Sequence, residues 1–93
     1  MPQARQAPVS FRSLKDEIVK RNLRFPARVE NVARLCFDDP ERLAFETTTV
    51  IARRAGVSRS TVLRFAILIG FSDIKSARRI FQDEIRIRSE QHL

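Results

Sequence analysis

The sequence has very few of the residues that most directly mark disulfide bonding, metal binding or catalysis. Cys36 is the only cysteine and His92 the only histidine in 93 residues. A single cysteine excludes an internal disulfide and a cysteine-rich metal site. No paired carboxylates, nucleophile with a base, or phosphate-binding loop can be recognised. We therefore expect no enzyme, no cofactor and no metal. Cys36 lies on an apolar helical face and is expected to be a buried small hydrophobe.

Glycine and long apolar runs are scarce as well. The chain has two glycines and neither tryptophan nor tyrosine, and its abundant Arg, Leu, Ala and Ile favour helices over strands. No uncharged apolar run approaches the roughly 20 residues that cross a bilayer. The opening MPQARQAPVS also lacks the apolar core of a signal peptide. These features predict a cytoplasmic, all-α protein with one domain and one modest core.

Positive charge is what the sequence has in excess. Lys and Arg number 18 against 11 acidic residues, which gives a formal charge of +7 and a pI near 11.2. Apart from Lys15, Lys20 and Lys75, every basic residue is arginine, whose planar fork matches phosphates and guanine edges. The imbalance favours a polyanionic partner, either nucleic acid or an anionic membrane. A merely soluble basic surface is the alternative, and composition alone leaves these open.

Apolar spacing predicts a compact bundle of five or six helices over residues 10–88. Residues 1–9 are expected to be frayed, and residues 89–93 to form a tail or the start of a linker. A first helix should begin after a cap at Ser10 or Ser13 and extend to about Asn22.

Three further elements are expected on either side of the central segment. A second helix should begin at Phe25-Pro26 and end at Asp38-Asp39-Pro40. One helical turn should then bring Leu43 and Phe45 to the core. Ser72 is expected to cap a last helix that extends to about Arg88.

The segment from Thr48 to Ile69, TTVIARRAGVSRSTVLRFAILI, predicts a helix-turn-helix. Ala52 is small where two helices would meet, and Gly56 can adopt the positive φ that ends the first helix. Ser58 can cap the second helix. In such a motif the second helix enters the DNA major groove, so we expect double-stranded DNA as the partner and a recognition helix at about 58–69.

A helical wheel separates the DNA candidates from the core of this second helix. Arg59, Ser60 and Arg64 lie on the outward side and are candidates for base or phosphate contacts. Leu63 beside them could contact a thymine methyl group. Thr48 and Thr49, at the start of the preceding helix, could offer hydroxyl and backbone N–H groups to a phosphate, or could simply cap it, as could Thr47. Two further arginines are predicted to face outward, near flanking phosphates or as solubilising charges: Arg78 and Arg79.

The chain also has more apolar residues than one small core needs. The surplus comprises Ile67, Leu68, Ile80 and Ile87. An exposed apolar patch of this kind usually marks an interface, so these residues predict a homodimer, which would suit a palindromic operator. The alternative is that the terminal helix covers them within one chain.

From about Phe11 to Arg88 the chain resembles the N-terminal domain of RpiR/MurR-type transcriptional regulators. The resemblance rests on the second helix, on Asp39-Pro40-Glu41, on the run from Ile51 to Ser58, and on the pattern VSxxTVxRFAxxxGF from Val57 to Phe71. It implies a helical DNA-binding domain, usually dimeric. In that family a sugar isomerase-type domain that senses phosphosugars follows. That domain is absent from these 93 residues, so the sequence is either a fragment of a longer regulator or a stand-alone domain.

By matching position, the resemblance implies recognition-helix roles for Ser58, Thr61 and Arg64. The chain departs from the family at Ile67 and Leu68, where basic residues are common. The leading hypothesis is therefore a sequence-specific DNA-binding domain of a bacterial regulator. Its main rival is a helix-turn-helix scaffold that acts as a protein-interaction or dimerisation module, and a basic membrane-surface helix is a weaker one. The operator, the regulated genes and the effector are not written in the sequence, nor is the choice between repression and activation.

Overall fold

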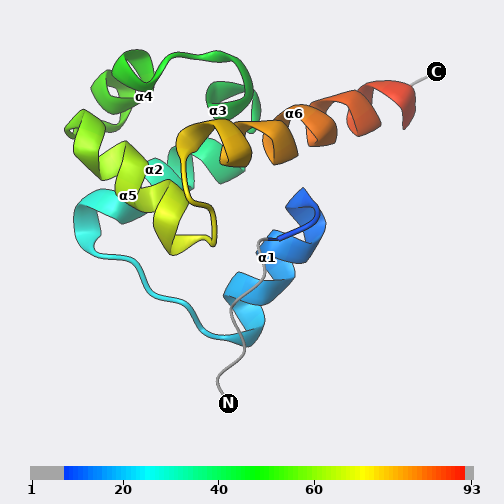
Figure 1. Cartoon of the computed structure of the whole chain (residues 1–93), viewed down its shortest axis with the longest axis horizontal. Coiled ribbons are helices and arrows are strands. Elements are labelled where there is room, and N and C mark those ends of the chain that lie inside the picture. The colour runs from blue at the N-terminus through cyan, green and yellow to red at the C-terminus, as the bar shows by residue number, and fades with distance from the viewer. Residues whose placement is uncertain (1–7, 92–93) are drawn as a thin grey trace.

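A computed structural model describes residues 8–91 of the chain, and these residues form six α-helices without a β-strand. The expected all-α fold class is confirmed. Figure 1 shows the helices in order. They are α1 (Phe11–Lys20), α2 (Ala27–Asp38), α3 (Glu41–Phe45), α4 (Thr48–Ala55), α5 (Arg59–Leu68) and α6 (Ile74–Gln91). The expectations for residues 1–7 and for His92 lie outside the described residues.

Both serines that could cap α1 form hydrogen bonds at its N-terminus. The Ser13 N–H donates to Ser10 Oγ at 3.0 Å, and the Ser10 N–H donates to Ser13 Oγ at 3.1 Å. This reciprocal arrangement satisfies two backbone donors that a helix end leaves without partners. The helix ends at Lys20 rather than near Asn22, because Asn22 adopts a positive φ of 49°.

The last helix differs from the prediction at both of its ends. Asp73, and not Ser72, provides the cap, since Asp73 Oδ1 accepts a hydrogen bond of 2.8 Å from the Ser76 N–H. Hydrogen bonds from Ser76 hold the pKa of the Asp73 carboxyl below its ordinary value. At the other end, α6 continues past Arg88 to Gln91, through part of the expected tail.

A chain of phenylalanine rings joins the helices through the core. Phe37 of α2 lies 5.8 Å from Phe65 of α5 and 5.9 Å from Phe81 of α6, measured between ring centroids. Phe11 of α1 contacts both Phe37 and Phe81, at 5.7 and 5.2 Å. Phe65 and Phe81 are fully buried, so these edge-to-face and tilted contacts fix how α5 sits on the rest of the bundle.

Cys36 and Phe45 were both expected to lie in the core, but only one of them is buried. Cys36 is fully buried, as expected, and burial raises the pKa of its thiol to about 12. Phe45 was expected to contact the core, but it is 65% exposed. The turn of α3 is so short that Leu43 and Ala44 occupy its whole inward side.

Helices α2, α4 and α5 pack together as a compact group, and the long helix α6 lies beside them (Figure 1). α5 packs against both α2 and α4, while α6 packs along α3 and contacts α1. Within residues 8–91, no helix is both long enough and apolar enough to cross a membrane. α5 also contacts α6, and the side of α5 that faces none of these helices is open to solvent.

Candidate nucleic-acid interface

The start of α4 is set by one of three consecutive threonines. Thr47 Oγ1 accepts a hydrogen bond of 3.2 Å from the Val50 N–H, which makes Thr47 the cap. Thr48 and Thr49 occupy the first helical positions, where Thr48 is half-buried and Thr49 exposed. The capping alternative therefore falls to Thr47, and the hydroxyl of Thr49 stays open to a partner.

The turn between α4 and α5 depends on the backbone conformation of Gly56. Its φ is 69° and its ψ 36°, in the left-handed region, and the following Val57 N–H donates to the Ala52 carbonyl at 2.9 Å. A Cβ on Gly56 would meet nothing within 4 Å. Glycine is thus favoured here by the dihedral angle rather than by a lack of space.

Ser58 and Thr61 form a small hydrogen-bonded unit at the start of α5. Ser58 Oγ accepts from the Thr61 N–H at 3.2 Å and lies 3.0 Å from Thr61 Oγ1. Ser58 therefore caps α5, as predicted. Thr61 is only 9% exposed. The structure therefore makes Thr61 much less accessible to DNA than Ser60 or Arg64, although the family resemblance implied a recognition role for it.

The rest of α5 divides into two faces as the helical wheel predicts. Its core face is fully buried and consists of Val62, Phe65 and Ala66. The opposite face is exposed and consists of Arg59, Ser60, Leu63, Arg64 and Ile67. We call these five residues the α5 outer face. It combines two positive charges, a hydroxyl and two aliphatic side chains.

The segment of sequence that contains the α5 outer face carries no acidic residue. From residue 47 to residue 72 the sequence has no Asp or Glu, and its charged residues are Arg53, Arg54, Arg59 and Arg64. Of these, Arg54 donates to Glu46 Oε1 at 2.9 Å. Among residues 8–91, the other three arginines form no ion pair with a carboxylate. Their charge is available to a polyanion.

Glu46 is the acidic residue that directly precedes this segment, and arginines bind both of its carboxylate oxygens. Arg42 Nη1 lies 2.6 Å from Glu46 Oε2, while Arg54 binds Oε1. Partial desolvation acts to raise the pKa of Glu46, but the hydrogen bonds from Arg42 and Arg54 outweigh it and leave that pKa below its ordinary value. Glu46 therefore stays ionised and paired, and does not neutralise the α5 outer face.

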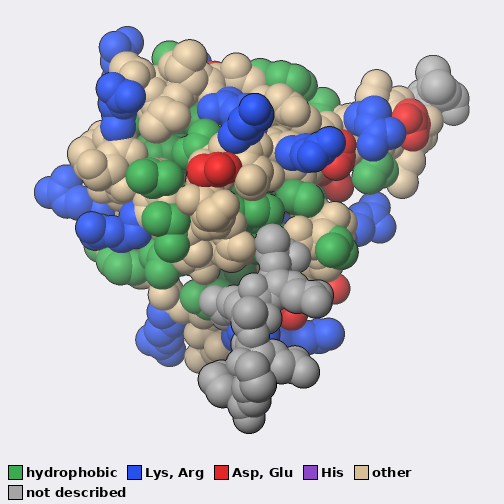
Figure 2. Space-filling view, viewed as in Figure 1, with side chains coloured by type: hydrophobic (Ala, Val, Ile, Leu, Met, Phe, Trp, Pro, Cys, Tyr) green, Lys and Arg blue, Asp and Glu red, His purple; other side chains and the backbone are tan. Residues whose placement is uncertain are grey.

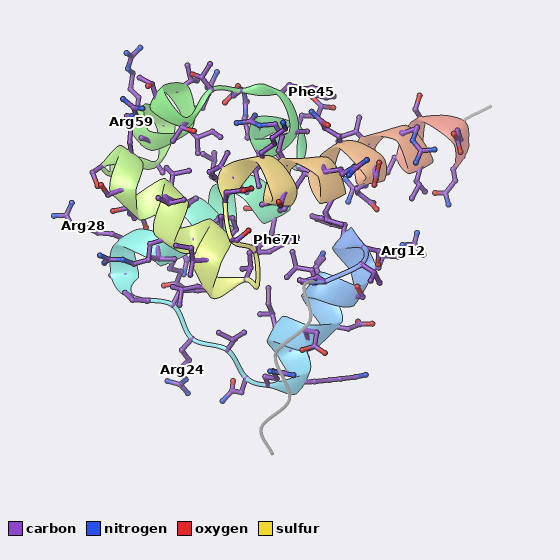
Figure 3. The ribbon with its side chains drawn as sticks, in the orientation of Figure 1. Arg12, Arg24, Arg28, Phe45, Arg59 and Phe71 are labelled. Atoms are coloured by element: carbon purple, nitrogen blue, oxygen red, sulfur yellow. The ribbon has the colours of Figure 1, made fainter. Side chains whose placement is uncertain are left out.

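Sequence reasoning missed two arginines on the same side of the molecule. Figure 3 shows Arg24, Arg28 and Arg59 along one side, with Arg12 on the opposite side. In Figure 2, the left margin carries basic side chains, while the acidic side chains in view lie mainly at the centre and right, where basic side chains occur as well. Arg24 and Arg28 are exposed, and in the described part of the chain neither forms an ion pair. The signal that could have found them is that neither has an acidic residue three or four positions away.

The prediction that Arg78 faces outward was wrong. Its Nη1 donates to the carbonyl of Leu43 at 2.9 Å and to that of Glu46 at 2.6 Å. Gln82 donates to the adjacent Ala44 carbonyl at 3.0 Å. These carbonyls belong to the end of α3, where a helix leaves acceptors without partners, so Arg78 has a structural role. Its neighbour Arg79 is exposed, as expected.

The four residues of the predicted dimer interface have different environments. Leu68 and Ile80 are half-buried against the chain's own core. Ile67 is 53% exposed and Ile87 is 36% exposed. Packing against the chain's own core thus covers part of the surplus apolar surface, and Ile67 belongs to the α5 outer face.

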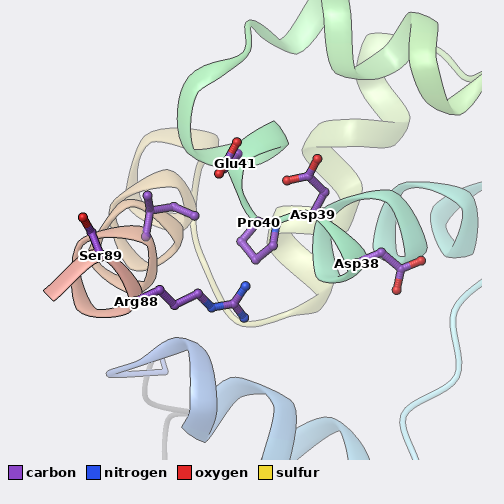
Figure 4. A pocket seen from close by; sticks show the side chains of 7 residues that line it. Asp38, Asp39, Pro40, Glu41, Arg88 and Ser89 are labelled. Carbon is purple, nitrogen blue, oxygen red and sulfur yellow. The ribbon is translucent and has the colours of Figure 1, made fainter. Parts of the chain in front are cut away.

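A shallow depression of about 400 Å³ lies where the α2–α3 junction meets α6. Figure 4 shows Asp38, Asp39 and Glu41 on one side of it and Arg88 on the other. The Arg88 Nε is already 2.6 Å from Glu84 Oε2. No group of three or more His, Cys, Asp or Glu in residues 8–91 is arranged to hold a metal. The depression is thus lined by acidic residues on one side and by an arginine that is already paired on the other.

Comparisons with family models, with curated proteins and with solved structures found no match to this chain.

Proposed function

We propose that this chain is a sequence-specific double-stranded DNA-binding domain in which α5 enters the major groove as the second helix of a helix-turn-helix. The observation that carries the proposal is the α5 outer face, whose arginines have no carboxylate partner in a segment free of acidic residues. The major groove admits an α-helix. Unpaired arginines there can bind phosphate oxygens or the O6 and N7 of guanine.

Each exposed polar residue of the interface has a role that follows from its position. Arg64 projects from the middle of α5 and is proposed to fork onto a guanine. Arg59, in the first turn, is proposed to bind a phosphate, and Ser60 to hydrogen-bond to a base edge or phosphate. At the start of α4, the exposed Thr49 hydroxyl and the backbone N–H groups around Thr48 favour a phosphate. Such contacts position the helix, while base contacts specify the sequence.

The flanking arginines extend the proposed contact beyond α5. Arg24 precedes α2 and Arg28 lies in its first turn, and α2 packs beside α5. Both are exposed on the side that carries Arg59 (Figure 3). We assign them to phosphates outside the base pairs that α5 reads.

The wider biological role follows from the sequence resemblance to RpiR/MurR-type regulators. It supports a bacterial transcription regulator that acts in the cytoplasm as a homodimer. Ile87 is the exposed apolar residue of α6 that supports self-association. Sedimentation at micromolar concentration tests this, and an Ile87→Ala variant should dissociate more readily. A parent that is monomeric throughout would contradict the dimer.

Selection from a random duplex library tests DNA binding most directly. We expect an enriched consensus, with two-fold symmetry if the protein is a dimer. Anisotropy titrations of the enriched duplex against a scrambled one then give the specificity. Arg86→Ala is a charge-matched control for α5 variants, because Arg86 is exposed on α6 and lies near Asp83 and Glu90. Enrichment of no sequence, together with no retention of duplex at moderate salt, would refute the proposal.

A protein-interaction module is the second candidate, and one observation favours it. Phe45 is 65% exposed, and it lies apart from Arg59 in Figure 3. An exposed aromatic ring is a common anchor in protein interfaces. A stable hetero-complex that is lost in Phe45→Ala, with no DNA retention, would support this candidate over DNA binding.

A further inference from the structure

Two aliphatic side chains on the α5 outer face are exposed to solvent instead of packing in the core. Leu63 is 43% exposed and Ile67 is 53% exposed, although the core face of the same helix is fully buried. They are four residues apart, so they lie one above the other along the helix. Arg64 and Ser60 lie on the same face. The face is therefore a mixed surface, with apolar side chains directly beside an unpaired arginine.

Charge argues against a second copy of this chain as the occupant of that face. A two-fold contact brings identical patches together. Here it would bring Arg64 of each copy towards the other, in a segment whose charged residues are all positive from residue 47 to residue 72. A partner that is negative overall but has apolar groups between its polar ones would complement both the arginines and the aliphatic side chains of this face. The major groove meets this description, because thymine presents a C5-methyl group there.

We infer that Leu63 and Ile67 contact thymine methyl groups, so that α5 reads apolar as well as polar features of its site. This inference rests on the proposed function and extends it to the composition of the site. Four residues span about 6 Å of helix axis at 1.5 Å per residue. Successive bases on a strand are about 3.4 Å apart. A helix that lies along the groove therefore places the two contacted thymines about two base steps apart, near the guanine that Arg64 binds.

The test removes single methyl groups from the DNA. In the duplex enriched by selection, each thymine is replaced in turn by deoxyuridine, which keeps pairing with adenine but lacks the C5-methyl group. We expect about a fourfold loss of affinity at each of two positions, because the duplex then lacks a methyl group whose burial on binding contributes about 0.8 kcal/mol. The other thymines should show little change.

Protein variants assign each methyl group to its side chain. In Leu63→Ala the deoxyuridine penalty should vanish at one of the two positions, and in Ile67→Ala at the other. Val19→Ala is the matched control, because Val19 is an exposed aliphatic residue of α1, 78% exposed, and should leave both penalties intact. Since Leu63 and Ile67 are exposed, their variants should keep the parent's melting temperature and circular dichroism.

The outcomes separate this inference from the proposed function. If no duplex is enriched or retained, DNA binding itself fails. If a duplex is bound specifically but lacks suitably spaced thymines, or shows no deoxyuridine penalty, only this inference fails. Penalties that persist unchanged in both variants overturn it as well. An Ile67→Ala variant that changes the sedimentation of the free protein without changing methyl dependence would show that a second copy occupies the face.

Discussion

Most arginines of α6 are held by partners within the chain, whereas most of those in the α4–α5 segment are not; the exceptions are the exposed Arg79 of α6 and Arg54 of α4, which pairs with Glu46. On α6, Arg88 binds Glu84, which is only 5% exposed, and Arg86 lies 3.5 Å from Asp83 and 3.7 Å from Glu90. Arg78 of α6 is held by backbone carbonyls. On α4 and α5, by contrast, Arg53, Arg59 and Arg64 are exposed and form no ion pair among the described residues.

This difference shows why net charge alone does not locate a binding surface. An arginine next to a carboxylate has much of its field offset, and surface pairs of this kind add little stability. An arginine without a partner keeps its field and attracts anions. Although both regions contribute to the charge of +7, we expect the α4–α5 segment to dominate any interaction with a polyanion.

The largest expected effect is that of salt on DNA affinity. Arg24, Arg28 and Arg59 are the proposed phosphate ligands, and Arg53 of α4 is a further exposed arginine without an ion pair. If each of the four neutralises one phosphate, log K should fall with log salt at a slope of about −3.6, so that affinity falls roughly a hundredfold between about 50 and 200 mM. Arg59→Ala should reduce the slope by about 0.9, and Arg86→Ala should leave it unchanged. Anisotropy titrations across salt measure this. A flat salt dependence would exclude a phosphate-driven mechanism.

Substitution of Arg64 tests base recognition by the α4–α5 segment. Arg64→Ala should weaken specific binding by about 1–3 kcal/mol, because the proposed bidentate contact to guanine would be lost. Arg86→Ala makes the same change in net charge on α6 and should be nearly neutral. Titration of both variants against the enriched duplex gives the comparison. Equal binding by Arg64→Ala and the parent would remove Arg64 from the interface.

The opposite pattern is expected for Arg78 of α6. Arg78→Ala should lower the free energy of unfolding by about 1–2 kcal/mol, because two carbonyls at the end of α3 lose a charged donor that is only partly exposed. Its DNA affinity should stay close to that of the parent. Arg79→Ala serves as the exposed neighbour and should change neither. Chemical denaturation would measure stability, and a stability loss in Arg79→Ala as large as that in Arg78→Ala would contradict this structural role.

The smallest effect concerns the turn that holds α4 and α5 together. Gly56→Ala should cost about 1 kcal/mol of folding stability, since an L side chain disfavours the left-handed region and the site is otherwise open. Gly56→Asn should cost less, because asparagine tolerates that region. Thermal melts of the two variants measure the difference. If alanine and asparagine behave alike, the turn does not require a positive φ at this position.

Most of the fold could be predicted from the sequence because its signals are local. The Thr47 and Ser58 caps, the Gly56 turn and the two faces of α5 depend on residues within a few positions of one another. Unpaired arginines follow this local signal only in part. Arg53, Arg59 and Arg64 have no acidic residue three or four positions away, but neither has Arg54, which pairs with Glu46 eight positions earlier. The prediction that Phe45 contacts the core was wrong, because one short helical turn cannot direct every apolar side chain inward.

By itself, the sequence determined the all-α class, the α4–turn–α5 segment and the excess of arginine, since periodicity, capping and composition are properties of the local chain. Only the tertiary structure decided which arginines and which aliphatic residues are free. Arg78 is bound by the carbonyl of Leu43, 35 residues earlier in the chain, a distance that local patterns cannot span. Likewise, Leu68 and Ile80 are half-buried while Ile67 stays exposed, because the packing of the helices, and not their hydrophobicity, decides which side chains are covered.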